Sequence, residues 1–179
     1  MKDYTINYQI DFFSPWHCGS GLAAGAETDA LVIKDKNGLP FIPGRTVKGL
    51  VRQAVEEVSG LKGDGFDVIA LFGDEGSSPS SLFFSNAVLT DAEVIVAEHL
   101  QSQLFSETAY TAIDKDGIAK QGSLRRMETV IPCQLQGRIL GIPSEEDKAA
   151  IVESLAYIKN LGLHRNRGLG RCTFTVKED

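Results

Sequence analysis

The chain of 179 residues is long enough to bury a core of its own and has the length of a single domain, residues 1–179. Its hydrophobic (42%) and charged (23%) residues are balanced as in ordinary globular proteins, and no apolar run approaches the roughly 18 residues of a membrane span. A net charge of −6 excludes a surface that binds nucleic acid everywhere, so any such site must be a local cluster of cations.

The N-terminal segment does not resemble a signal peptide. "MKDYTINYQI" lacks both a basic start and a long apolar stretch, so we expect a cytoplasmic protein with no membrane partner. In that reducing compartment Cys18, Cys133 and Cys172 are expected to be free thiols, because they lie far apart and form no CxxC pair.

The first half of the chain predicts a strand, a hairpin and a helix. Residues 4–13, "YTINYQIDFF", alternate apolar and polar side chains with the two-residue period of a half-buried strand. Residues 29–43 predict a hairpin, with a turn at Asn37 and Gly38 between two apolar runs. Thr46 is then a candidate N-cap for a helix that ends near Gly60, with its apolar residues on one face.

The second half predicts three strands and a helix around an irregular insertion. Residues 80–94 and 127–142 have strand character, residues 143–162 predict a helix with an acidic first turn, and residues 171–178 predict a last strand. Residues 98–127 are polar and without a sustained period, so we interpret them as an insertion that projects from the core. The resulting order βαββαβ predicts an α+β, ferredoxin-like (RRM-like) core with an added β-hairpin and this insertion.

The segment "LGLHRNRGLGRC", residues 161–172, concentrates positive charge on flexible backbone. Its glycines permit positive φ and a close approach of the backbone to a ligand, while its cations can donate to phosphate oxygens. The residues assigned to RNA binding here are His164, Arg165, Arg167, Gly168, Gly170 and Arg171. The alternative is a helix C-cap followed by a solvated turn into an edge strand.

Two other segments are basic. The predicted helix start carries Arg45, Lys48 and Arg52, of which the last two lie four residues apart on one helical face. The insertion carries a second group of assigned RNA-binding residues, which comprises Lys120, Arg125 and Arg126. If folding gathers all three basic segments on one face, the acidic protein acquires a basic groove. The alternative for the predicted helix start is an exposed basic helix face without a ligand.

Asp29 is a carboxylate at the junction between a small-residue segment and the predicted hairpin. By itself it is most simply a loop-capping residue. His17, beside Trp16, is a candidate general acid or base-stacking partner, with a structural histidine as the alternative. The sequence contains no HExxH motif and no Ser/His/Asp grouping, so motifs give no independent support for catalysis.

These segments, in this order, resemble the RAMP superfamily of CRISPR-associated proteins. The segment "LGLHRNRGLGRC" resembles the glycine-rich loop of that superfamily, and "LPFIPGRTVKGLVR" resembles its Pro-Gly turn into a basic helix. Three further segments, "DALVIKDKNGLPFIPG", "LFG" at 71–73 and "IDKDGIAKQGSLRRMETV", are similar to the backbone subunit of type III Csm and Cmr effector complexes. The resemblance spans nearly the whole chain.

The resemblance implies a subunit that polymerises along CRISPR RNA beside other effector subunits. Its glycine-rich loop and basic helix would hold the guide backbone, and a thumb, residues 105–130, would wedge between guide and target RNA. In cleaving members of the family, an Asp in the hairpin loop cuts target RNA with a divalent metal, and Asp29 matches that position. Asp29 is thus the implied catalytic and metal-binding residue of an endoribonuclease, with Mg²⁺ as the expected ion.

Two alternatives remain open from the sequence. The chain is short for this subunit, so a non-catalytic RNA-binding scaffold would share every RNA-holding residue and differ only at Asp29. Some RAMP relatives instead process CRISPR RNA precursors by metal-independent acid-base cleavage with a histidine, for which His17 and His164 are the candidates here.

Overall fold

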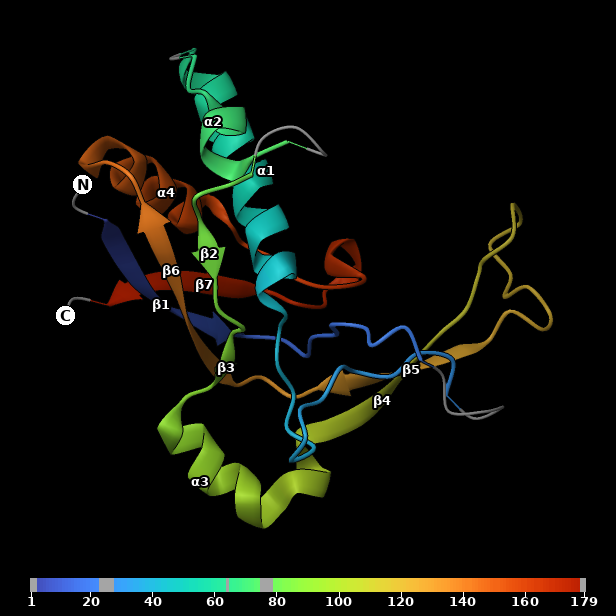
Figure 1. Cartoon of the computed structure of the whole chain (residues 1–179). Coiled ribbons are helices and arrows are strands. Elements are labelled where there is room, and N and C mark those ends of the chain that lie inside the picture. The colour runs from blue at the N-terminus through green and yellow to red at the C-terminus, as the bar shows by residue number, and fades with distance from the viewer. Residues whose placement is uncertain (1–2, 23–27, 64, 75–78, 178–179) are drawn as a thin grey trace.

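The computed structural model describes residues 3–22, 28–63, 65–74 and 79–177. Its elements form a mixed α+β fold with two antiparallel sheets, as the sequence predicts (Figure 1). Within the described residues, no helix is both long and apolar enough to cross a membrane. The strands are β1 (Tyr4–Phe12), β2 (Phe83–Phe84), β3 (Val88–Leu89), β4 (Phe105–Tyr110), β5 (Arg125–Val130), β6 (Gln134–Ile142) and β7 (Cys172–Lys177), and the α-helices are α1 (Gly44–Lys62), α2 (Val68–Phe72), α3 (Asp91–Leu100) and α4 (Glu145–Tyr157).

The larger sheet has the order β2-β6-β1-β7, and β3 also pairs with β6. Strand β1 is central and antiparallel to both neighbours, with Ile10 opposite Leu135 of β6 and Phe174 of β7. Alternate residues of β1 are buried, which is the reason that its two-residue period could be recognised in the sequence. The sheet thereby has one face in the core and one polar face.

Helices α1 and α4 pack against each other and contact strands of the larger sheet (Figure 1). Val47, Val51 and Val55 put the apolar face of α1 into the core, and Ile151 and Leu155 do the same for α4. Ser144 caps α4 by accepting a hydrogen bond from the Asp147 backbone N–H, and the first turn is acidic as predicted. Burial of these side chains is the main stabilisation of the core.

The smaller sheet is an antiparallel pair of β4 and β5, which we call the ribbon. The ribbon and its connecting loop, residues 111–124, extend away from the larger sheet (Figure 1). Trp16 attaches its base to the core, because Trp16 and Val130 exchange two backbone hydrogen bonds. Trp16, Met127 and Val130 are fully buried there.

The structure divides the predicted strand 127–142. Its first residues belong to β5 in the ribbon and the rest to β6 in the larger sheet, with a break at residues 131–133. Apolar alternation continues across this break, so the pattern could not reveal it, whereas Pro132 could have marked it. The predicted strand 80–94 is also shorter, because the chain forms only β2 and β3 before α3 begins at Asp91.

Other boundaries shift as well. Helix α1 begins at Gly44 after Pro43 rather than after Thr46, and it ends at Lys62, where Gly63 has positive φ. Helix α4 ends at Tyr157, so Gly162 is not its stop. The predicted hairpin 29–43 is held by isolated bridges, such as that between Lys34 and Pro40, and not by regular strands.

The predicted insertion contains more regular structure than expected, and parts of two other predicted segments lie outside the described residues. The insertion 98–127 includes the end of α3, strand β4 and the start of β5, so much of it is regular. Residue 178 of the predicted last strand, and residues 23–27 of the small-residue segment before Asp29, lie outside the described residues.

Candidate RNA-binding site

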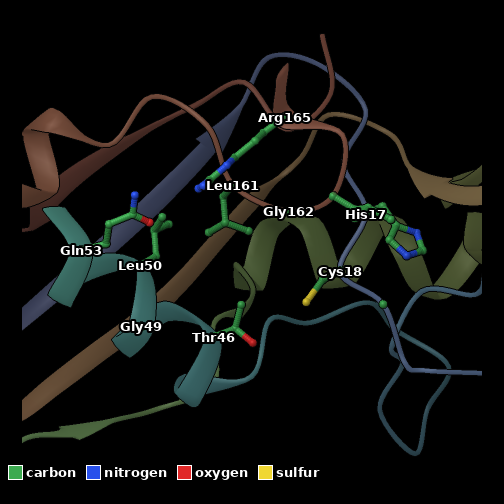
Figure 2. Close-up of a pocket in the computed structure, with 11 residues that line it drawn as sticks. His17, Cys18, Thr46, Gly49, Leu50, Gln53, Leu161, Gly162 and Arg165 are labelled. Carbon is green, nitrogen blue, oxygen red and sulfur yellow. The ribbon is translucent and has the colours of Figure 1, made fainter. Parts of the chain in front are cut away.

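A hollow of about 480 Å³ lies between the start of α1, residues 17–19 and the segment 161–172, which we call the glycine loop (Figure 2). Helix α1 contributes Thr46, Gly49, Leu50 and Gln53, which recur at the helical spacing and therefore share one face. The glycine loop contributes Leu161, Gly162, Leu163 and Arg165. Two of the three predicted basic segments are thus brought together at one site.

The backbone of the glycine loop is fixed by hydrogen bonds to the core. Leu161 N–H donates to the Gly170 carbonyl (2.9 Å), Leu163 N–H to that of His17 (3.0 Å) and Gly170 N–H to that of Pro15 (2.8 Å). Gly170 has φ +67°, and a Cβ there would lie 1.9 Å from the Leu161 carbonyl oxygen. Only glycine fits this position, so the close approach of the two ends of the loop depends on Gly170.

Apart from Arg52, which pairs with Glu56, the cations of the α1 start and of the glycine loop have no ion-pair partner within the described part of the chain, in which five ion pairs occur. The unpaired set is Arg45, Lys48, Arg165, Arg167 and Arg171. Burial, followed by the nearby Arg52, lowers the pKa of Lys48, so a second positive charge lies close to this side chain. An anion near these groups would offset their positive charge.

His164 lies where the glycine loop meets the ribbon. Its ring contacts that of Tyr110 with a centroid distance of 4.6 Å and an interplanar angle of 54°. The residue has φ +56°, the one positive φ of a non-glycine residue among the described positions. Burial, then Arg167 and then His17 lower the pKa of His164, so these surroundings disfavour a positive charge on its imidazole.

His17 is a structural residue in this fold. Its side chain is buried, and Nδ1 lies 2.7 Å from the carbonyl oxygen of Glu128 on β5, within hydrogen-bond distance. Figure 2 shows the His17 ring turned away from the hollow, whereas the Cys18 side chain points toward it. The cysteines Cys18, Cys133 and Cys172 are all free and buried.

Asp29 lies at the base of the ribbon, apart from the hollow. Its backbone N–H donates to the carbonyl of Arg126, and its Oδ2 accepts a hydrogen bond from the Arg126 N–H, both at 2.8 Å. Its Oδ1 lies 3.8 Å from Nε of Arg125, and the side chain is 45% exposed. The carboxylate therefore joins the hairpin segment to β5 and still faces solvent.

Asp29 is a weak metal ligand when considered with the protein alone. Within the described residues, no group of three or more His, Cys, Asp or Glu side chains could enclose an ion. Mg²⁺ is often bound by one or two carboxylates together with substrate phosphates and water, and a half-exposed carboxylate fits that arrangement. An ion at Asp29 would therefore need RNA or water as further ligands.

The remaining predicted RNA-binding cations are either bonded to other groups of the protein or lie away from the hollow. Arg52 donates to the Gly73 carbonyl and to Glu56, which ties α1 to the end of α2. Arg126 pairs with Glu107 across the ribbon. Lys120 is exposed in the connecting loop of the ribbon, away from the hollow.

Sequence reasoning missed the apolar lining of the hollow. Leu50, Leu161 and Leu163 were not among the predicted site residues, yet all three border the cavity, and Leu163 is 49% exposed. The helical spacing of Thr46, Leu50 and Gln53 was a usable signal. No sequence signal pointed to Tyr110, because its contact with His164 joins residues 54 positions apart.

Comparison with known proteins agrees with this architecture. Two solved structures cover nearly the whole chain at 14% identity and a TM-score of 0.71. One is the Type III-B Cmr-beta complex bound to cognate target RNA (97% of this chain and 97% of that chain), and the other is its apo state (98% and 98%). No curated protein matches the sequence. The RAMP superfamily matches residues 9–173, and the chain therefore belongs to the RAMP superfamily.

Proposed function

We propose that this protein is a CRISPR RNA-binding backbone subunit of a type III effector complex. The observation that carries the proposal is the presence of unpaired cations on the glycine loop and on the start of α1, two segments that meet at the hollow. A polyanion is the ligand that such a site fits, because each phosphate neutralised releases counterions. The fold shared with subunits of a complex bound to target RNA supports RNA as that polyanion.

The larger sheet with α1 and α4 is, in this proposal, the ferredoxin-like core. The ribbon and its connecting loop form the thumb, which would separate guide from target RNA at intervals. Copies of the chain would follow one another along the guide beside other effector subunits. The acidic remainder of the surface would keep the free subunit soluble, while the cations hold the guide backbone.

RNA binding by the full chain tests this proposal. Replacing Arg165, Arg167 and Arg171 together with Ala should weaken binding to single-stranded RNA and reduce the slope of log K against log salt by about 2. The matched control replaces Arg125 and Arg126, which pair with Asp29 and Glu107, and should change the slope less. Salt-independent binding, or an unchanged slope in the triple variant, would contradict the proposal.

We further propose that Asp29 takes part in metal-dependent cleavage of target RNA. Its exposed carboxylate lies at the base of the ribbon, beside the element that would splay a target nucleotide. When bound, Mg²⁺ would stabilise charge on the scissile phosphate. Asp29 would orient the ion.

Cleavage by the reconstituted complex separates this nuclease from a scaffold. Asp29→Asn retains an acceptor for the Arg126 N–H, whereas Asp29→Ala removes it, so the pair distinguishes charge from structure. The proposal expects regularly spaced cuts in Mg²⁺ that disappear in EDTA and in both variants while RNA binding persists. Binding without cutting by the wild type would leave a scaffold subunit.

A further inference from the structure

The walls of the hollow are unlike the basic surface around it. Leu50, Leu161 and Leu163 and the bare backbone of glycines form much of its lining, and Figure 2 shows Leu50 and Leu161 on the side of the cavity toward α1. Among the described lining residues, only Arg165 carries a permanent charge. A phosphate group placed here would lose water without enough cations to compensate, so the hollow does not fit the RNA backbone.

Two polar side chains that line the hollow, Gln53 and Arg165, are exposed to solvent. Figure 2 shows the Arg165 side chain extending from the glycine loop toward Gln53 and Leu161. Gln53 donates Nε2 to Glu57 at 2.8 Å, and within the described residues its amide oxygen accepts no hydrogen bond. An apolar slot with an amide acceptor and a guanidinium donor at the rim matches a flat ring that has apolar faces and a polar edge.

We propose that the hollow receives an unstacked nucleobase of the bound RNA. This inference rests on the proposed RNA-binding function and adds a second kind of contact to it. The volume of about 480 Å³ lies within the range of small-molecule pockets, about 300–1,000 Å³. The phosphates on either side of the base then lie along Arg45, Arg167 and Arg171, which are outside the lining of the hollow.

Gly49 offers a way to fill the hollow without disturbing the fold. It is a helical residue in α1 that lines the cavity, and a Cβ added there meets no atom within 4 Å. Gly60 lies in the same helix, also has open space around an added Cβ, and does not line the hollow. Gly49→Leu and Gly60→Leu are therefore matched, because each replaces glycine by a good helix former.

The experiment measures binding of the full-length chain to a single-stranded RNA and to the same RNA with abasic riboses. Gly49→Leu should bind the intact RNA about tenfold more weakly, the loss expected when one apolar contact is blocked, with an unchanged salt slope. Gly49→Ala and Gly60→Leu should bind as the wild type does. The wild type should bind abasic RNA more weakly than intact RNA. The wild type and Gly49→Leu should bind abasic RNA with equal affinity.

The possible failures are distinct. Equal affinities of Gly49→Leu and Gly60→Leu for intact RNA would overturn the base pocket and leave the RNA-binding function untouched. A fall in the salt slope of Gly49→Leu would also overturn it, because that result means a lost phosphate contact. If the Arg165, Arg167 and Arg171 variant binds like the wild type, the proposed function fails before the base pocket is reached.

Discussion

The glycine loop and the ribbon use charge in opposite ways. The loop is held by backbone hydrogen bonds, such as that from Leu161 to Gly170, and its arginines have no ion-pair partner within the described residues. The ribbon is held at its base by carboxylates. Glu128 accepts hydrogen bonds from the Val32 N–H (3.0 Å) and Lys34 Nζ (2.7 Å), and Asp29 accepts one from the Arg126 N–H.

This difference explains how an acidic chain keeps a basic site. Positively charged side chains near carboxylates are neutralised by them, so the cations of the ribbon base contribute to folding more than to the external field. In the glycine loop, small residues allow the backbone to supply the stabilisation, which leaves the charges for a ligand. Changes in the loop should therefore alter both stability and RNA affinity, whereas changes at the ribbon base should alter stability and leave the affinity for single-stranded RNA near the wild-type value.

The largest effect is expected from Gly170→Ala. The new Cβ would overlap the Leu161 carbonyl and the residue would keep positive φ, so we expect a loss of stability on the order of 2–5 kcal/mol. Gly168→Ala is the matched control, since Gly168 has φ +90° but open space, and it should cost about 1–2 kcal/mol. Urea unfolding measures both, and equal losses would mean that the close approach at Gly170 is unimportant.

A smaller effect is expected from Glu128→Gln at the ribbon base. The Glu128 side chain is only 15% exposed, and an amide cannot accept from both Val32 and Lys34, so we expect a loss of about 1–3 kcal/mol. Glu107→Gln, whose pair with Arg126 is exposed, should change stability by less than about 0.5 kcal/mol. The salt slope of RNA binding should stay at the wild-type value in both variants. A reduced slope for Glu128→Gln would show that the two regions are not separable.

The smallest effect concerns His164, where the two regions meet. Burial, Arg167 and His17 hold its pKa below the ordinary value of 6.5, so the unfolded chain binds the proton more tightly than the folded protein. Its contribution to stability is therefore present above about pH 6.5 and is lost as the pH falls toward the depressed pKa. Thermal unfolding between pH 7.5 and 5 should show a shallower acid decline for His164→Asn, because Asn tolerates positive φ. An identical decline would assign the pH dependence to other groups.

Local patterns predicted the fold where one face of an element is buried. Strand β1 and the apolar face of α1 follow that rule, whereas the start of α4 was recognised from its acidic first turn, which complements the helix dipole. The rule failed at residues 127–142, because alternation cannot tell whether successive residues pair within one sheet or in two. Pairing between distant segments, and not local preference, divides β5 from β6.

The site could be predicted in part for a similar reason. The cations of the glycine loop and of the α1 start stand out by residue type, and folding brings these two segments together at the hollow, where Arg165 is one of the lining residues. The engagement of Arg52 by Gly73 and Glu56 depends on tertiary contacts that no short segment reveals. The same holds for the hollow itself, which requires Leu161 to pack beside Leu50 and Cys18.

The most direct test of RNA binding at the glycine loop is ultraviolet cross-linking of the full-length chain to single-stranded RNA, with the attached peptides identified by mass spectrometry. We expect cross-links in residues 161–172 and 45–53, with the Arg165, Arg167 and Arg171 variant losing those in the loop. Cross-links confined to the polar face of the larger sheet, or none in residues 161–172, would contradict the account.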